Sequence, residues 1–387
     1  MREPLALAAA EQVARHNLRH NFISCLVIAA QNGYAREVDP FAGLCRETWG
    51  EEALFDAIKD LPHGMGLFIF NQRRYPRPLR RTRIMYAART GDMARLKFLL
   101  ARNPRLDLAD CEGHSAVHWA AHMGHAPAVC ALVDAGVDVD ALDAEGRTAL
   151  MHACSGGYAA VVRELLQRGG SVALTNAEHG VRLSPLLCAS AAGNPEIVRM
   201  LLEKGADKEL GSYTGSTSLH VAAERGRTDV VRVLLDDGAD LSARQVHGRT
   251  ALHLAASAGL LGVVRILLRR GADVDATDDR AQTALHLSVT KGHREVARVL
   301  IKKGADKELP DGADCSALFL ACSARNLDLI RLLIDKGCNM EASSGFENGA
   351  TPLIFSCKYE VEAVVRLLLS KGANVDAQDE FGFSSLH

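Results

Sequence analysis

A serine or threonine followed two residues later by an aliphatic residue recurs ten times along this chain at a nearly constant interval. The intervals are 33, 33, 36, 33, 33, 33, 33, 35 and 33 residues. A period of this length indicates a repeat protein, in which each repeat packs only on its neighbours. The ten positions are Thr82, Ser115, Thr148, Ser184, Thr217, Thr250, Thr283, Ser316, Thr351 and Ser384.

The repeat that starts at Thr250 shows what each unit is expected to fold into. Thr250 has a short hydroxyl that can accept a hydrogen bond from a backbone N–H, which predicts the start of a helix. Gly259 ends that helix because glycine adopts a positive φ without steric cost, and a second helix then returns and ends at Gly271. Residues 273–281 form an extended turn. With aromatic residues at only 5% of the chain, the pattern predicts an all-α solenoid of stacked helix pairs.

Three repeats contain Thr-x-Leu-His, each followed by a glycine and then by Gly-Ala-Asp. These segments start at Thr217, Thr250 and Thr283 and end at His220, His253 and His286, and they resemble the ankyrin repeat. The resemblance implies nine complete repeats and the start of a tenth within residues 81–387. It also implies finger-like turns and a protein-binding role. No Gly-rich phosphate loop, Gly-x-Ser-x-Gly or kinase-like motif occurs, so neither a catalytic centre nor a cofactor is expected. The three histidines are interpreted as structural residues that bond to the backbone.

The helix-ending glycine is replaced in the last two complete repeats, by Arg325 and Glu360. Because an ordinary side chain is strained at positive φ, these positions predict strain or a different turn. An insertion from Ser343 to Ala350 predicts a longer finger nearby. Asn103 replaces the second glycine of the first repeat, and asparagine tolerates the left-handed conformation. Pro127 and Pro195 are expected at the starts of second helices, where a missing N–H costs nothing.

Residues 1–80 show no clean repeat, and we interpret them as diverged repeats or a helical cap. An alternative comes from Leu44, Trp49 and the pair Leu54–Phe55, which resemble the later half of an F-box. That resemblance implies a substrate receptor of a ubiquitin ligase. A run of arginines at 73–83 is interpreted as a solvated linker, with nuclear import or RNA contact as the alternative.

Composition narrows the function further. The formal net charge of −2 gives no general attraction to nucleic acid or to anionic lipid. No secretory signal or membrane-spanning segment is predicted, so the cytoplasm is expected, with the nucleus as an alternative. The cysteines at helix positions that prefer small residues are expected to be core residues with free thiols. They are Cys154, Cys188, Cys322 and Cys357.

Five potential metal ligands lie within fifteen residues of the second repeat. His118 and His122 have the spacing at which two helical histidines can hold one ion. We nevertheless expect no metal centre, because the repeat pattern itself favours histidine at two of the five positions and the glutamate of a zincin is absent. The five residues are Cys111, His114, His118, His122 and His125.

The sequence predicts a protein–protein interaction scaffold or adaptor, which is expected to be a monomer without a small-molecule substrate. The chain stops four residues into the tenth repeat. This suggests a truncated product, so an alternative is a targeting module for an enzyme or channel domain beyond residue 387. Contact residues are expected at finger tips and at the exposed ends of first helices. They are Tyr86, Arg89, Trp119, His122, Met123, Tyr213, Glu224, Arg225, His247, Arg280, Thr290, Lys291, Lys358 and Tyr359.

Overall fold

The computed structural model describes residues 82–386 except 103 and 177–181. The described part contains eighteen α-helices and two short 3₁₀ helices, and it has no strand beyond isolated bridges. The chain divides into two compact units, Met1–Glu145 and Gly146–His387. The expected cap, the F-box-like segment and Asn103 lie outside the described residues, and the proposed domain boundary at residue 80 stays a prediction.

Each repeat opens with a short helix capped by the recurring serine or threonine. Thr148 Oγ1 accepts a hydrogen bond from the N–H of Met151 (3.3 Å), and Ser184 Oγ accepts one from Leu187 (3.2 Å). These bonds confirm the predicted helix starts. The first helices are α6 (Arg83–Thr90), α8 (Ala116–His122), α10 (Ala149–Gly156), α12 (Pro185–Ala192), α14 (Ser218–Glu224), α16 (Ala251–Ser257), α18 (Ala284–Thr290), α20 (Ala317–Ser323) and α22 (Pro352–Lys358).

A second helix of eight or nine residues follows in each repeat and packs against the first. Pro195 is the first residue of its helix and Pro127 the second, as predicted. The second helices are α7 (Met93–Leu100), α9 (Ala126–Asp134), α11 (Ala159–Gln167), α13 (Pro195–Glu203), α15 (Thr228–Asp236), α17 (Leu261–Arg269), α19 (Arg294–Lys302), α21 (Leu327–Asp335) and α23 (Glu362–Ser370).

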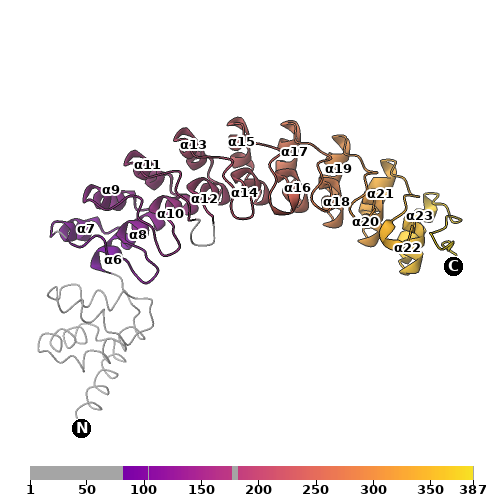
Figure 1. Ribbon diagram of the computed structural model, residues 1–387, viewed down its shortest axis with the longest axis horizontal. Coiled ribbons are helices and arrows are strands. Elements are labelled where there is room, and N and C mark those ends of the chain that lie inside the picture. The colour runs from indigo at the N-terminus through magenta and orange to yellow at the C-terminus, as the bar shows by residue number, and fades with distance from the viewer. Residues whose placement is uncertain (1–81, 103, 177–181, 387) are drawn as a thin grey trace, which may run out of the picture. The chain divides into compact units, whose positions relative to one another are not determined.

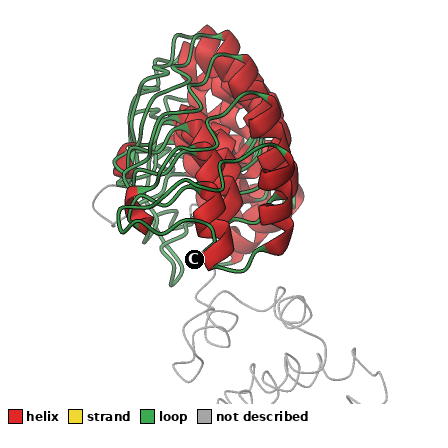
Figure 2. Ribbon diagram, turned by 90° about the vertical axis from the view of Figure 1, so that its right-hand side faces the viewer, coloured by secondary structure: helices red, strands yellow, loops and turns green. Residues whose placement is uncertain are grey.

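In the unit Gly146–His387 the first helices form one row and the second helices form another (Figure 1). Each helix packs on its own repeat partner and on the equivalent helix of the next repeat, as α16 does on α17 and α18. The connecting fingers extend to one side of the two rows (Figure 2). This arrangement confirms the predicted solenoid, because each repeat buries its apolar face only against its neighbours.

Small side chains fill the space between neighbouring first helices. Ala255 and Ala256 are fully buried, and larger residues such as Leu267 reach the core from the second helix. Cys154 and Cys322 are fully buried too, and burial raises the pKa of the Cys322 thiol to about 12. Such thiols act as small apolar core residues, as predicted. Cys357 is only half-buried, so the prediction is wrong for that position.

The two helix ends that lack glycine keep the turn of the other repeats. Arg325 has φ +55° and Glu360 φ +54°, close to the +72° of Gly259 at the equivalent position. Arg325 and Glu360 therefore keep the turn of the other repeats in a strained, left-handed backbone conformation. The insertion at 343–350 does form a longer finger. It contains a 3₁₀ helix, η3 (Gly345–Glu347), and is closed by a bridge between Ser344 and Ala350.

Candidate functional site

In several fingers, one aspartate carboxylate accepts hydrogen bonds from backbone N–H groups at the base of the finger. The sequence analysis did not identify these aspartates. Asp278 Oδ1 accepts hydrogen bonds from the N–H groups of Arg280 (2.9 Å) and Gln282 (3.0 Å). Its Oδ2 accepts one from Arg249 Nε of the preceding repeat (3.3 Å). Asp110, Asp311 and Asp379 accept equivalent backbone bonds in their own fingers. The signal in the sequence was the spacing of Asp278 and Asp311, which equals the repeat period.

The histidine of Thr-x-Leu-His joins one repeat to the next. His253 Nδ1 accepts the N–H of Thr250 (3.2 Å), and Nε2 lies 3.0 Å from the carbonyl oxygen of Gln282. A carbonyl oxygen only accepts, so Nε2 carries the hydrogen and the ring is neutral. His220 and His286 make the same pair of contacts in their repeats. The predicted structural role of these histidines is confirmed.

These three histidines make stability depend on pH. Burial lowers the pKa of His220, His253 and His286, against a smaller opposing effect of nearby backbone carbonyls and carboxylates. A histidine whose pKa is lowered by folding stabilises the folded state above its unfolded pKa. That contribution is lost as the pH falls through the folded pKa. These three histidines therefore make the fold less stable in acid.

In the unit Met1–Glu145, Trp119 lies at the centre of an aromatic and basic cluster. Its Nε1 donates a hydrogen bond to Asp110 Oδ2 (3.0 Å), which orients the half-buried ring. The guanidinium carbon of Arg89 lies 5.6 Å from the ring centroid, and the ring of exposed His122 lies 6.0 Å away. The structure thus brings together three of the predicted contact residues. Exposed Met123 follows His122 in the chain.

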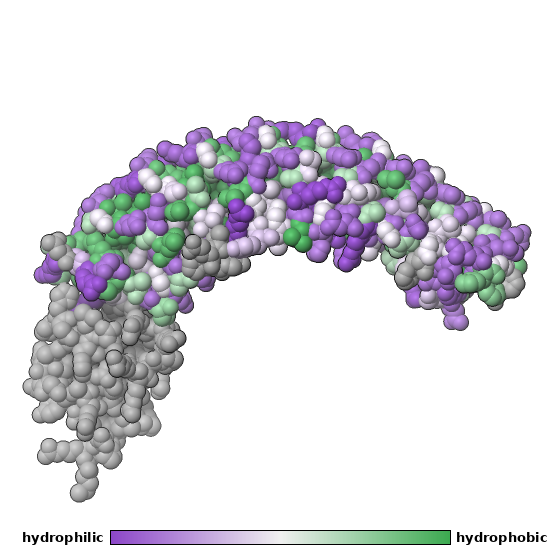
Figure 3. All heavy atoms as spheres, viewed as in Figure 1, coloured by the Kyte–Doolittle hydropathy of each residue, from purple (hydrophilic) through white to green (hydrophobic). Residues whose placement is uncertain are grey.

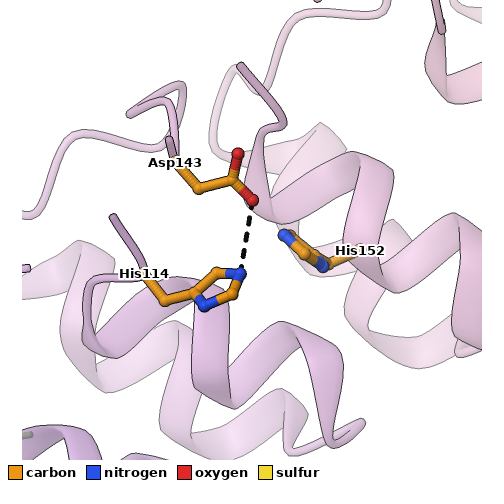
Figure 4. A group of neighbouring side chains, drawn as sticks. All are labelled: His114, Asp143 and His152. Atoms are coloured by element: carbon orange, nitrogen blue, oxygen red, sulfur yellow. Dashed lines mark ion pairs between the residues drawn. The ribbon is translucent and has the colours of Figure 1, made fainter. Parts of the chain in front are cut away.

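His114 lies among three carboxylates of the same unit. Its Nε2 is 3.3 Å from Asp143 Oδ2, as Figure 4 shows, and its Nδ1 is 3.3 Å from Glu112 Oε2 and 3.7 Å from Asp110 Oδ1. The contact with Asp143 raises the pKa of His114, and the other two carboxylates add to the effect against partial burial. This contribution to stability is present below the unfolded pKa and is lost as the pH rises through the folded pKa. His114 occupies the position at which Arg249 contacts Asp278 in a later repeat.

Two other histidines of the second repeat each contact a different backbone carbonyl oxygen. His118 Nε2 lies 3.0 Å from the carbonyl oxygen of Ala141, and His125 Nε2 lies 3.0 Å from that of Arg89. Cys111 is exposed at the finger tip. Contacts within and between repeats therefore account for the high local density of histidine.

The contact residues predicted in the unit Gly146–His387 all lie at exposed positions. One group stands where first helices end, and the other stands on the fingers. Tyr86 and Arg89 of the first unit are instead half-buried. Exposure permits contact with a partner without showing it, so the binding role stays a proposal. The exposed residues are Tyr213, Glu224, Arg225, His247, Arg280, Thr290, Lys291, Lys358 and Tyr359.

The longer finger is attached to the end of α22 through Glu347, which the sequence analysis did not single out. Glu347 Oε2 lies 2.7 Å from Lys358 Nζ, and Oε1 accepts a hydrogen bond from the hydroxyl of Tyr359 (2.9 Å). The Lys358 ammonium lowers the pKa of the Glu347 carboxyl, although burial opposes this. The ring of Tyr359 packs on Phe355, with centroids 4.7 Å apart. Two predicted contact residues are thus held in a fixed geometry.

Stacked helix pairs with a Ser/Thr cap, a left-handed glycine and a carboxylate-based finger define a class of helical repeat solenoid. A sequence profile described as ankyrin repeats (3 copies) matches residues 84–176, 171–245, 243–311 and 308–379. The chain therefore belongs to the ankyrin-repeat family. Repeats of this family are protein–protein interaction modules.

A solved structure supports this assignment, and one further protein is similar to part of the chain. The crystal structure of the human ASB11 ankyrin repeat domain is 29% identical and superposes with a TM-score of 0.54. It covers 58% of this chain and 99% of its own. A protein named L-asparaginase from Dirofilaria immitis is 34% identical over 141 residues, which are 36% of this chain and 23% of that protein. The chain thus spans under a quarter of the length of that relative. No helix in the described residues is both long and apolar enough to cross a bilayer.

Proposed function

We propose that this protein is a non-enzymatic scaffold or adaptor that binds a partner protein through its fingers and the exposed ends of its first helices. The observation that carries the proposal is that each repeat contains two kinds of residue, which differ in burial and in how they vary between repeats. Residues that hold the fold, such as Thr250, His253 and Asp278, are buried and recur at the repeat period. Residues at the first-helix ends, such as Arg225 and Lys291, are exposed and differ between repeats.

The finger backbone is fixed before a partner arrives. Asp278 holds the N–H of Arg280, and the carbonyl oxygen of Arg280 accepts a hydrogen bond from Gly312 of the next finger (2.7 Å). A surface that is ordered in advance loses less conformational entropy on binding. Exposed side chains on such fingers therefore suit recognition of a folded partner or an extended segment.

Asparaginase activity is not part of the proposal, because the match covers only 23% of that protein. We also propose that the protein is monomeric and cytoplasmic. Buried free thiols such as Cys154 and Cys322 support a reducing compartment.

Proximity labelling in cells tests the proposed surface. The full chain is compared with the charge reversal Arg225→Glu combined with Lys291→Glu, which changes two exposed helix ends. The matched control is Arg199→Glu on α13, an exposed position in the second-helix row. We expect the double variant to lose a subset of labelled proteins that the wild type and the control retain. Identical sets in all three, with unchanged circular dichroism, would show that this surface does not bind a partner.

A further inference from the structure

Two adjacent second helices of the unit Gly146–His387 carry a concentration of positive charge. Helices α17 and α19 pack on each other and, with the residues that end them, carry seven basic side chains and one acidic one, Glu295. All of the basic residues except half-buried Arg298 are exposed. We name this the α17/α19 basic patch. It consists of Arg265, Arg269, Arg270, Arg294, Arg298, Lys302 and Lys303.

The charge is local to these two repeats. The preceding second helix, α15 with its C-terminal Asp237, carries three acidic residues and one basic residue. The following one, α21 with Lys336, carries two of each. The whole chain has a formal net charge of −2. A generally basic composition therefore does not explain the patch.

Most of this charge is not neutralised within the fold. Arg270 pairs with Asp236 of α15, and Arg298 Nη1 lies 3.5 Å from Glu295 Oε2. In the part of the chain that the structure describes, the other five basic residues of the patch form no ion pair. They are Arg265, Arg269, Arg294, Lys302 and Lys303.

The nearest acidic residues along the chain are engaged elsewhere. Asp273 Oδ1 accepts the N–H of Asp275 (3.1 Å), and Asp306 Oδ1 accepts the N–H of Glu308 (2.9 Å). Asp275 Oδ1 in turn accepts the N–H of Asp306 (2.9 Å). These carboxylates stabilise the turns that follow α17 and α19. Because they form no ion pair with the patch, the surface of α17 and α19 keeps an excess of positive charge.

The stability of the helices explains only part of the patch. Arg269 and Lys302 are the last residues of their helices, where the helix dipole favours a cation. Arg294 is the first residue of α19, where the same dipole disfavours a cation. Arg265 lies in the middle of α17. Like charges gathered on neighbouring helices also repel one another, so an anionic partner would relieve a cost that the fold carries.

We propose that the α17/α19 basic patch binds an acidic segment of a partner protein, on a surface distinct from the fingers and first helices. The edge formed by the second helices is strongly hydrophilic in Figure 3. Arginine side chains there can each pair with a carboxylate through two parallel N–H groups. Charge complementarity therefore selects a segment rich in aspartate or glutamate.

Other polyanions fit the patch less well. Neither helix contains an aromatic residue, so the stacking that single-stranded nucleic acids use is missing. The large exposed hydrophobic residues of the described chain all lie outside α17 and α19, so insertion into a membrane is not favoured.

Fluorescence anisotropy of a labelled polyglutamate peptide, titrated with the full chain at low and moderate salt, tests the proposal. We expect saturable binding that weakens with salt. The variant Arg265→Glu with Arg294→Glu should weaken it by about tenfold or more. The control Arg199→Glu, at the position of α13 equivalent to Arg265, should change it less than about twofold. The neutral pair Arg265→Gln with Arg294→Gln, checked by circular dichroism, separates lost binding from misfolding.

Three results would overturn the proposal. They are absence of polyglutamate binding by the wild type, equal losses in the patch variant and the α13 control, and tighter binding of duplex DNA or phosphatidylserine vesicles of matched charge. The first-helix variants used to test the proposed function leave this patch intact. The two proposals can therefore fail independently.

Discussion

Replacing Arg325 by glycine should stabilise the protein. Arg325 ends α20 with φ +55°, a conformation that glycine adopts at equivalent positions in other repeats. A left-handed residue other than glycine costs about 1 to 2 kcal/mol. Glycine itself lowers the free energy of unfolding by about 0.5 to 1 kcal/mol, because it has more conformational freedom in the unfolded chain. The net expectation is a stabilisation of about 0.5 to 1 kcal/mol.

The environment of Arg325 adds little to this difference. The side chain is exposed and forms no ion pair within the described residues, so its removal opens no cavity. The turn itself is kept by a hydrogen bond from the N–H of Arg325 to the carbonyl oxygen of Cys322 (2.9 Å), which glycine also makes. Glu360 has the same conformation at the end of α22. The double variant should therefore gain about twice the single effect.

Urea unfolding followed by circular dichroism measures the change. The matched control is Gly157→Ala, because Gly157 has φ +73° and an added Cβ would meet no atom within 4 Å. That variant isolates the conformational cost and should lose about 1 kcal/mol. If Arg325→Gly left the midpoint unchanged or lowered it while Gly157→Ala was destabilising, strain at Arg325 would not be the reason for the expected gain.

Three further predictions concern individual contacts. Lowering the pH from 7 to about 5 should lower the free energy of unfolding of the wild type, as measured by urea unfolding. In His253→Gln the same change of pH should have a smaller effect, because one histidine with a lowered pKa is removed. Asp110→Ala should cost about 2 kcal/mol by leaving backbone N–H groups and the indole of Trp119 without their acceptor, while Asp110→Asn should cost less; unfolding followed by tryptophan fluorescence measures both. Glu347→Ala should return the raised pKa of Tyr359 toward its ordinary value in an ultraviolet titration, since the hydrogen bond to Glu347 is the main cause of the shift.

The fold could be predicted because its determinants are local and repeated. Thr250 caps a helix through atoms three residues away, and Gly259 ends it through its own backbone conformation. Neither effect requires knowledge of what packs on the repeat. The sequence period then supplies the neighbours, since identical hairpins can bury their faces on one another.

The contacts between repeats were harder to predict. Arg249 reaches Asp278, and His253 reaches the carbonyl oxygen of Gln282, each across 29 residues. Whether these atoms meet depends on how far each hairpin is displaced from the next one along the stack. The attachment of Lys358 and Tyr359 to Glu347 depends in addition on the insertion at 343–350, which departs from the 33-residue period. Periodicity gives no information about a feature that occurs once.

Residues that stabilise the stack and residues that are available for recognition also differ in how freely they can vary. A residue that must fit two neighbouring repeats, as His253 does, has little freedom to vary, because its change would break contacts on both sides. Exposed residues such as Lys291 and Arg294 have no such constraint. They lie near opposite ends of the turn between α18 and α19, one beside the first-helix row and one on the second-helix row. A single repeat can therefore take part in two binding surfaces without altering the contacts that hold it in the stack.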